Sequence, residues 1–382
     1  MTDFKDPFIM LRRIFIDVNS YKITKLCDFT VITFHSLVLC LQLYYMIRHF
    51  DVNLSIKYGP ITAFFLFMTV SAVLSGALSQ DIFRAVAFFE KISWSLDVIR
   101  KEARIKLERK CQVINTCISC ILLFSSTTMV INLPFCENQR YFFISNQVFE
   151  EYFGKWSVLL NVFYYSGVPY LGYHSVKPCF VFVYAILEIQ LQFSLIEEYL
   201  LQTYETDYLE SGEHLEDTQY QREIGEALRR CITHHVQLKK LIDMMVDIVL
   251  MYMPFFLVLG VFLLITCFAF IINFADTTTN TVKVQAFMFV VTALCNTVLF
   301  CWNGQQLIDV TNSIFLTLGG APWYHWNVEN IKILLMFITN CTKNDSIVLA
   351  GICLDYKMFV SVFRISVSYA LVLFNLRKRS LV

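Results

Sequence analysis

Seven long apolar stretches, separated by polar segments, set the pattern of this chain. A helix needs about 20 residues to cross roughly 30 Å of hydrocarbon. The stretches that reach this length lie at about 29–47, 59–78, 111–133, 178–196, 249–273, 284–302 and 356–376. The pattern predicts an all-α, polytopic membrane protein with seven transmembrane helices, forming a single membrane domain over residues 1–382.

The fourth stretch is the most polar of the seven. It contains Glu188, Gln190 and Gln192 within otherwise apolar sequence. Polar side chains inside a membrane face protein or water rather than lipid. We therefore expect this helix to turn its polar face toward other helices.

Two segments predict helical extensions outside the membrane. Residues 197–248 include an amphipathic run that leads directly into the fifth stretch, and residues 303–338 follow the sixth stretch. The uneven loop lengths place both extensions on the same side. His234 and His235 lie on the first extension, and because adjacent helical residues point to different faces, we expect them to be solvated.

Composition excludes several classes of protein. The chain is 57% hydrophobic and 16% charged, whereas a soluble domain is about a quarter charged. A net charge of zero gives no attraction to nucleic acid. Cys117 and Cys120 form a Cys-x-x-Cys pattern without a partner pair, so we expect no metal and no cofactor. No motif for phosphate binding, metal-dependent hydrolysis or a nucleophile elbow is present, so the sequence does not indicate an enzyme.

Charge distribution predicts the orientation of the helices. If the N-terminus and the 2–3, 4–5 and 6–7 loops share one side, that side carries more than twice as many Lys and Arg residues as the other. Lys and Arg prefer the cytoplasm, so the N-terminus is expected to be cytoplasmic and the C-terminus extracellular. The terminal "RKR" opposes this orientation, but it is a short tail. Asn53, in "NLS", would then face outside as a glycosylation acceptor.

A polar stripe follows the last helix, 356–376. Ser361, Arg364, Ser368, Val372 and Asn375 are spaced three or four residues apart and share one face. Such a stripe must face water or protein. It either lines an aqueous conduit between subunits or packs against the fourth to sixth helices.

The C-terminal third carries the residues of a resemblance. Cys301-Trp302-x-Gly304, the pair Asn312-Ser313, and "PWYHW" are followed by Lys332, by "LAG" and by "SYALVLFNL". These motifs resemble insect odorant receptors over roughly the last 80 residues. In "SYALVLFNL", Ser368, Tyr369, Asn375 and Leu376 are conservative variants of the wider insect chemoreceptor signature. The "LGGAP" segment departs from the family, which commonly has Tyr near Gly319.

The resemblance implies a ligand-gated, non-selective cation channel in which four subunits surround one pore. An odour-specific subunit would assemble with the olfactory co-receptor in the plasma membrane of a sensory neuron dendrite. The last helix, 356–376, would line the pore, with a hydrophobic gate at Val372 and Leu376 and with Ser368 and Asn375 on the pore wall. The segments 197–248 and 303–338 would form an inter-subunit anchor through Trp323, Tyr324 and Trp326; an interfacial helix with aromatic residues at headgroup level is the alternative.

The resemblance also places a small volatile odorant in the outer half of the bundle, between the second, third, fourth and sixth helices. The side chains expected there are Phe64, Phe67, Met68, Ser71, Ser125, Thr128, Met129, Tyr184, Leu187, Phe287 and Val291. For each of them, ordinary helix packing is the alternative. Glu188 is either a buried packing residue or a polar site for ligand or gating.

Three other functions stay open from the sequence. A gustatory receptor of the same superfamily would bind less volatile tastants and need no co-receptor. A G-protein-coupled receptor would have the opposite orientation, and its acidic-Arg-Tyr and Asn-Pro-x-x-Tyr motifs are missing. A transporter is disfavoured because no internal repeat is visible.

Overall fold

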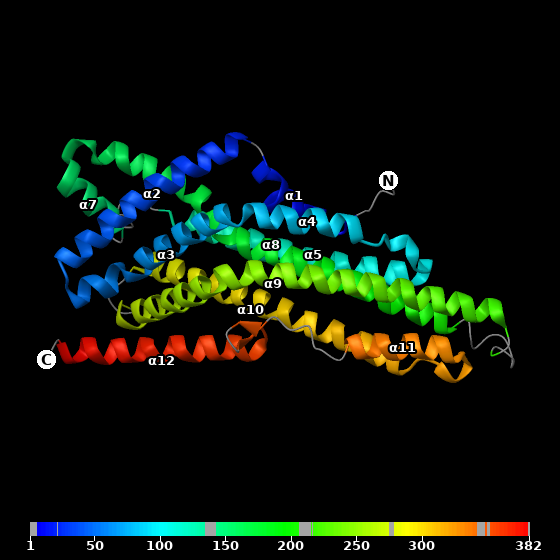
Figure 1. Ribbon diagram of the computed structural model, residues 1–382. Helices are drawn as coiled ribbons and strands as arrows, with labels where there is room; N and C mark the ends of the chain where they lie inside the picture. The colour runs from blue at the N-terminus through cyan, green and yellow to red at the C-terminus, as the bar shows by residue number, and fades with distance from the viewer. Residues whose placement is uncertain are drawn as a thin grey trace.

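A computed structural model shows the arrangement of the chain (Figure 1). It describes residues 6–20, 22–133, 143–205, 215, 217–274, 279–341, 348–349 and 352–380. The side chains of Asn53 and Leu376 lie outside this description. Both residues were predicted from the sequence to have functional roles, glycosylation and gating respectively.

Helices account for nearly all of the described structure. In chain order the elements are α1 (Ile9–Phe15), η1 (Asp17–Ser20), α2 (Lys22–Arg48), α3 (Val52–Ala77), α4 (Ser79–Ile92), η2 (Leu96–Val98), α5 (Lys101–Ile131), α7 (Ile144–Phe153), η3 (Gly154–Trp156), α8 (Ser157–Glu205), α9 (Thr218–Phe274), α10 (Asn280–Gly319), η5 (Trp323–His325), α11 (Val328–Cys341), β1 (Val348–Leu349), β2 (Ile352–Cys353) and α12 (Tyr356–Ser380). Seven helices within this part of the chain are long and apolar enough to cross a membrane, as the hydrophobic pattern predicts.

Three of the helices are much longer than a membrane is thick. At about 1.5 Å per residue, the 57 residues of α9 span about 86 Å, against roughly 30 Å of hydrocarbon. α8 has 49 residues and α10 has 40 residues. Figure 1 shows α11 beside α9 and α10 at the end of the molecule opposite the C-terminus. The described parts of the first predicted extension, and the beginning of the second, are therefore continuations of the membrane helices α8, α9 and α10, and α11 is a separate helix.

α8 is the central helix of the bundle and packs against α3, α9 and α10. Glu188 and Gln192 are buried within it, as expected for a helix whose polar face avoids lipid. The prediction that this helix begins at 178 was wrong, because α8 begins at Ser157. His174 and Lys177, which precede the predicted stretch, are polar and yet buried inside the bundle.

The expectation that His234 and His235 are solvated was also wrong. Both side chains are buried, because α9 is covered on two sides. The His234 ring stacks on Trp94 at 4.3 Å, and its Nε2 lies 3.0 Å from Gln192 Oε1. The His235 ring packs edge-on against Phe337 of α11, with ring centroids 5.3 Å apart. Adjacent positions on a helix can both be interior when neighbours pack on both faces.

At Gly304, α10 comes very close to the segment that precedes α12. A Cβ atom at this position would lie 2.2 Å from the Leu354 carbonyl oxygen and 2.8 Å from Leu354 Cγ. Only a residue without a side chain fits there. This contact accounts physically for the glycine in the Cys301-Trp302-x-Gly304 motif.

We expect Gly304→Ala to lower the unfolding free energy by roughly 1–3 kcal/mol, because overpacking forces the backbone apart. Gly76→Ala is the matched control, since its Cβ would meet nothing within 4 Å. The thermal midpoint of the detergent-purified protein measures both changes. Equal midpoints for the two variants would contradict the close contact.

Candidate functional site

An apolar cavity of about 170 Å³ lies inside the bundle between α3, α5, α8, α9, α10 and α12. A cavity of about 150 Å³ is large enough to hold benzene. None of the described side chains that line it is an acid, a lysine, an arginine or a histidine. The space therefore suits a small, neutral, mostly apolar molecule.

Five of the side chains predicted from the sequence line this cavity together. They come from the second and third membrane helices, and they are Phe64, Phe67, Ser125, Thr128 and Met129. Phe67 packs edge-on against Phe256 of α9 with ring centroids 4.7 Å apart. Aromatic walls with a methionine give a shape-tolerant apolar surface.

Other predicted residues from the second and fourth membrane helices lie elsewhere. Met68 and Leu187 are buried in packing clusters beside the cavity. Ser71 donates a hydrogen bond to the Ser175 carbonyl oxygen at 3.0 Å. Tyr184 lines a different cavity, of about 40 Å³. These four positions hold helices together in this chain rather than surround the larger space.

On α10 the structure presents a different face from the one expected. Phe287 is 63% exposed on the outside of the bundle, and Val291 does not line the cavity. Phe289, Thr292 and Asn296 line it instead. Side chains two positions apart on a helix point in directions that differ by about 200°. Choosing 287 in place of 289 therefore selects nearly the opposite face. The polar residues Thr292, Asn296 and Thr297 were the available signal for the inward face of α10, because polar side chains in a membrane helix face the interior.

Two helices that were not expected at the ligand site also contribute to it. Met253 and Gly260 of α9 form part of its wall, and Met358 and Val362 of α12 form another part. Met358, Val362, Ser366 and Ala370 recur every four residues on the buried face of α12. The cavity therefore touches the last helix directly.

A small polar patch interrupts the apolar wall where α5 meets α10. Thr292 Oγ1 donates to Thr128 Oγ1 at 2.9 Å. Asn296 Nδ2 donates to Ser125 Oγ at 3.2 Å and to the Thr292 carbonyl oxygen at 2.9 Å. A few fixed polar groups in an apolar pocket orient a ligand and select among ligands.

A smaller cavity of about 100 Å³ adjoins the first. The two share Phe64, Met129, Asn132 and Phe289 as lining residues. Its far wall includes Lys57 and Pro60 at the beginning of α3. This arrangement places it between the larger cavity and the α2–α3 connection.

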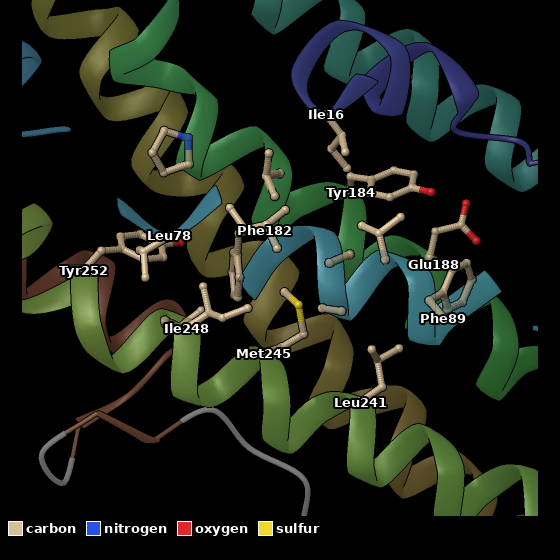
Figure 2. A pocket seen from close by; sticks show the side chains of 17 residues that line it. Ile16, Leu78, Phe89, Phe182, Tyr184, Glu188, Leu241, Met245, Ile248 and Tyr252 are labelled. Atoms are coloured by element: carbon tan, nitrogen blue, oxygen red, sulfur yellow. The ribbon is translucent and has the colours of Figure 1, made fainter. Parts of the chain in front are cut away.

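The cavity that contains Tyr184 lies where α1, α4, α8 and α9 meet (Figure 2). Figure 2 shows Tyr184 and Glu188 together at one side, with Met245 and Ile248 of α9 facing them. The Tyr184 hydroxyl donates to Asp6 Oδ2 at 3.1 Å, so the N-terminal segment covers this side.

A salt bridge ties the N-terminal segment to α4. Arg12 forms an ion pair with Glu90. Partial burial disfavours the Arg12 charge, but the hydrogen bond to Glu90 and the nearby negative groups prevail and raise the pKa of Arg12. The segment is thus held in place by charge as well as by the buried side chains of α1.

The polar stripe on α12 is free within this chain. Ser361, Arg364, Ser368 and Asn375 are exposed, and Val372 is 49% exposed. The stripe therefore does not pack against the fourth to sixth helices of the same chain, which was the alternative to a conduit. Met358 and Val362, on a face turned about 100° from the stripe, contact the cavity.

The three aromatic residues of "PWYHW" have different environments. Trp323 is 53% exposed and Tyr324 is 56% exposed, whereas Trp326 is 2% exposed. Trp326 packs on Tyr204 of α8 with ring centroids 5.8 Å apart. Gln221 of α9 fixes this segment by donating to the His325 carbonyl oxygen at 2.9 Å. Trp326 therefore belongs to the core of the chain, and the other two are surface residues.

Comparison with known proteins identifies the family. A model of the 7tm odorant receptor family matches residues 96–367, which is most of the chain. The chain belongs to the odorant receptor family. It is thus a multi-pass membrane receptor of olfaction, and not an enzyme. The match favours the first of the functions considered from the sequence. A search of curated proteins finds no match to this odorant receptor.

Solved structures of insect olfactory receptors have a fold similar to that of this chain. The structure of this odorant receptor is similar to the insect olfactory receptor OR5 from Machilis hrabei in complex with eugenol, with a TM-score of 0.69 and 11% identity over 98% of this chain and 97% of that chain. It is also similar to a second structure of Machilis hrabei OR5, with a TM-score of 0.68 and 11% identity over 97% and 96% of the two chains. At this identity the likeness concerns the fold alone.

Proposed function

We propose that this odorant receptor is the odour-binding subunit of a ligand-gated, non-selective cation channel. Small volatile odorants enter the cavity of about 170 Å³ between α3, α5, α8, α9, α10 and α12. The observation that carries the proposal is that one face of α12 lines this cavity while its polar face, turned about 100° from the first, is exposed. A ligand in the cavity therefore contacts the same helix, α12, that forms the wall of the aqueous path.

In this proposal four subunits place their α12 stripes around one pore. Ser368 and Asn375 supply the wetted wall, and Val372 with Leu376 forms a hydrophobic gate near the outer end. Narrow rings of aliphatic side chains exclude water and so block ions. The ligand opens the gate by binding the open state more tightly than the closed one. The eugenol bound to Machilis hrabei OR5 is a small, largely apolar molecule of the kind that such a cavity accepts.

The family and the exposed aromatic surface support the choice of partners. The olfactory co-receptor provides the other subunits, and the exposed Trp323 and Tyr324 contact a neighbouring subunit at the anchor end. Aromatic residues with a polar group are typical of interface cores. The excess of Lys and Arg supports a cytoplasmic N-terminus and an extracellular C-terminus in the plasma membrane of a sensory dendrite.

The proposed function is tested by recording membrane current in cells that express the chain with and without a co-receptor subunit. We expect a panel of small neutral odorants to evoke a cation current only when both are present. The absence of current from any odorant, with the chain and the co-receptor both detected at the cell surface, would overturn the proposal.

The gate makes a separate prediction. Val372→Ala shortens one aliphatic ring of the constriction and lets water enter, so current without ligand is expected to rise about threefold or more. Val360→Ala is the control, because Val360 is similarly exposed but lies 12 residues, or about 18 Å, away along the helix. A leak that rises equally in both variants, at matched surface levels, would remove Val372 from the gate.

A further inference from the structure

We infer that the cavity selects ligands that carry one hydroxyl group, and that Asn296 and Ser125 bind this group together. The inference rests on the proposed function, in which this cavity is the odorant site. It narrows the ligand from a small neutral molecule to an alcohol or a phenol. The argument depends on which hydrogen-bonding atoms of these two side chains are already used.

The orientation of the Asn296 amide is fixed by its neighbours. One end of the amide lies 2.9 Å from the Thr292 carbonyl oxygen, which can only accept a hydrogen bond. The amino group must therefore be at this end. The same amino group donates to Ser125 Oγ at 3.2 Å, so both of its hydrogens are used within the chain.

The other end of the amide, Oδ1, is an acceptor without a partner. It is shut off from solvent and has no hydrogen bond to any described group. A buried acceptor that makes no hydrogen bond is costly, and inside a membrane little bulk water can satisfy it. Asn296 also lines the cavity. Because Oδ1 itself has almost no accessible surface, a ligand reaches it when the amide turns slightly toward the cavity, and the new hydrogen bond then removes that cost.

Ser125 offers the complementary group. Its Oγ accepts from Asn296, and Ser125 itself lines the cavity. The next three residues, Ser126, Thr127 and Thr128, each donate their hydroxyl hydrogen to the carbonyl oxygen four residues earlier at 2.9 Å. Among the described groups, no acceptor is assigned to the hydroxyl hydrogen of Ser125. It is thus available to donate to a ligand.

A hydroxyl group matches this pair because it both donates and accepts. It donates to Asn296 Oδ1 and accepts from Ser125. Ethers, ketones and esters accept but do not donate, so they leave Oδ1 unsatisfied. Carboxylates and amines bring a charge into a cavity whose described lining carries none to balance it. The apolar remainder of the wall accepts the hydrocarbon part of the ligand.

The test compares small alcohols with their own methyl ethers. The ether lacks the hydroxyl hydrogen that donates a hydrogen bond, and it keeps the same hydrocarbon skeleton with one added methyl group. Benzyl alcohol with benzyl methyl ether, and 1-hexanol with its methyl ether, are the probes. We expect the ether to need about tenfold more ligand than the alcohol for half-maximal current through the chain and co-receptor complex. We also expect each alcohol to raise the thermal midpoint of the purified complex more than its methyl ether does.

Two variants assign the preference to these side chains. Asn296→Leu keeps a similar volume without the acceptor and is expected to bring alcohol and ether within about twofold of each other. Ser125→Ala is expected to weaken the alcohol response about threefold to fivefold. Ser126→Ala and Asn312→Leu are the matched controls, because both residues are exposed on the same two helices and lie outside the cavity lining.

Each outcome separates the inference from the proposed function. Ethers that act as well as alcohols in the unaltered chain would overturn the hydroxyl inference and leave the channel standing. Alcohol-selective stabilisation without any current would support the inference and overturn the channel. If Asn296→Leu does not reach the surface, Ser125→Ala decides: a retained alcohol response at full strength counts against the site.

Discussion

Trp326→Ala is expected to lower the unfolding free energy by about 3–5 kcal/mol, the cost of truncating a fully buried aromatic side chain. The indole is 2% exposed and packs on Tyr204 of α8. Its removal leaves a void where η5, α8 and α9 meet, and the Gln221 bonds that hold this segment lose their support. Loss of the folded receptor from the cell surface is the expected result.

The neighbouring Trp323 provides the control for this prediction. Trp323→Ala makes the same substitution three residues away, at a side chain that is 53% exposed. We expect it to change the unfolding free energy by within about 0.5 kcal/mol. Trp326→Phe should lie between the two, since it keeps an aromatic ring and removes an indole N–H that has no partner among the described groups. Thermal midpoints in detergent measure the series, and equal midpoints for Trp326→Ala and Trp323→Ala would contradict the packing.

The second large effect is expected at Asp28. This carboxylate of α2 accepts a hydrogen bond from the Tyr170 hydroxyl, and its Oδ1 lies 2.8 Å from His174 Nε2. The buried Lys177 is close enough for its charge to interact with it. Asp28→Ala leaves the Lys177 ammonium without this counter-charge inside the bundle. A cost of about 3–5 kcal/mol is expected, and purified protein would show it as a lowered thermal midpoint.

A double variant distinguishes lost charge balance from lost packing at this site. Asp28→Leu with Lys177→Met removes both charges and keeps apolar volume, so it is expected to recover most of the stability lost in Asp28→Ala. Asp51→Ala is the control, because Asp51 is exposed and its side chain makes no capping hydrogen bond to α3. A double variant as unstable as the single one would show that Lys177 does not depend on Asp28.

Much of the architecture was predictable from hydrophobic periodicity. Seven spans follow from the lengths of the apolar runs, and the helical extensions follow from an amphipathic run and the uneven loop lengths. The start of α8 was not predictable in this way, because His174 and Lys177 resemble a loop until Asp28 is known to lie beside them. The pairing partner comes from a helix about 150 residues earlier in the chain, and no local pattern indicates it.

The candidate site was predictable in part for a similar reason. Ser125 and Thr128 were expected at the ligand site from the resemblance, and they line the cavity, as the rule that polar residues in a membrane helix face inward also indicates. The same rule applied to α10 selects Thr292 and Asn296. A choice by size and hydrophobicity gives Phe287 instead, but a large apolar side chain can equally well face lipid. The contribution of α9 and α12 depends on how whole helices pack, which a single sequence does not encode locally.

The uninterrupted length of α9 has a mechanical consequence. Gln221, near one end of this rod, holds the segment that carries Trp323 and Tyr324, and Met253 and Gly260, farther along, line the ligand cavity. The same rod is the main support of α12. We expect a load on its far end, such as a tethered protein or a bulky chemical label, to shift both places, with Pro254 as the point where the helix bends. The concentration of odour that a cell detects is then expected to change with a load at the remote end, with the cavity itself unaltered.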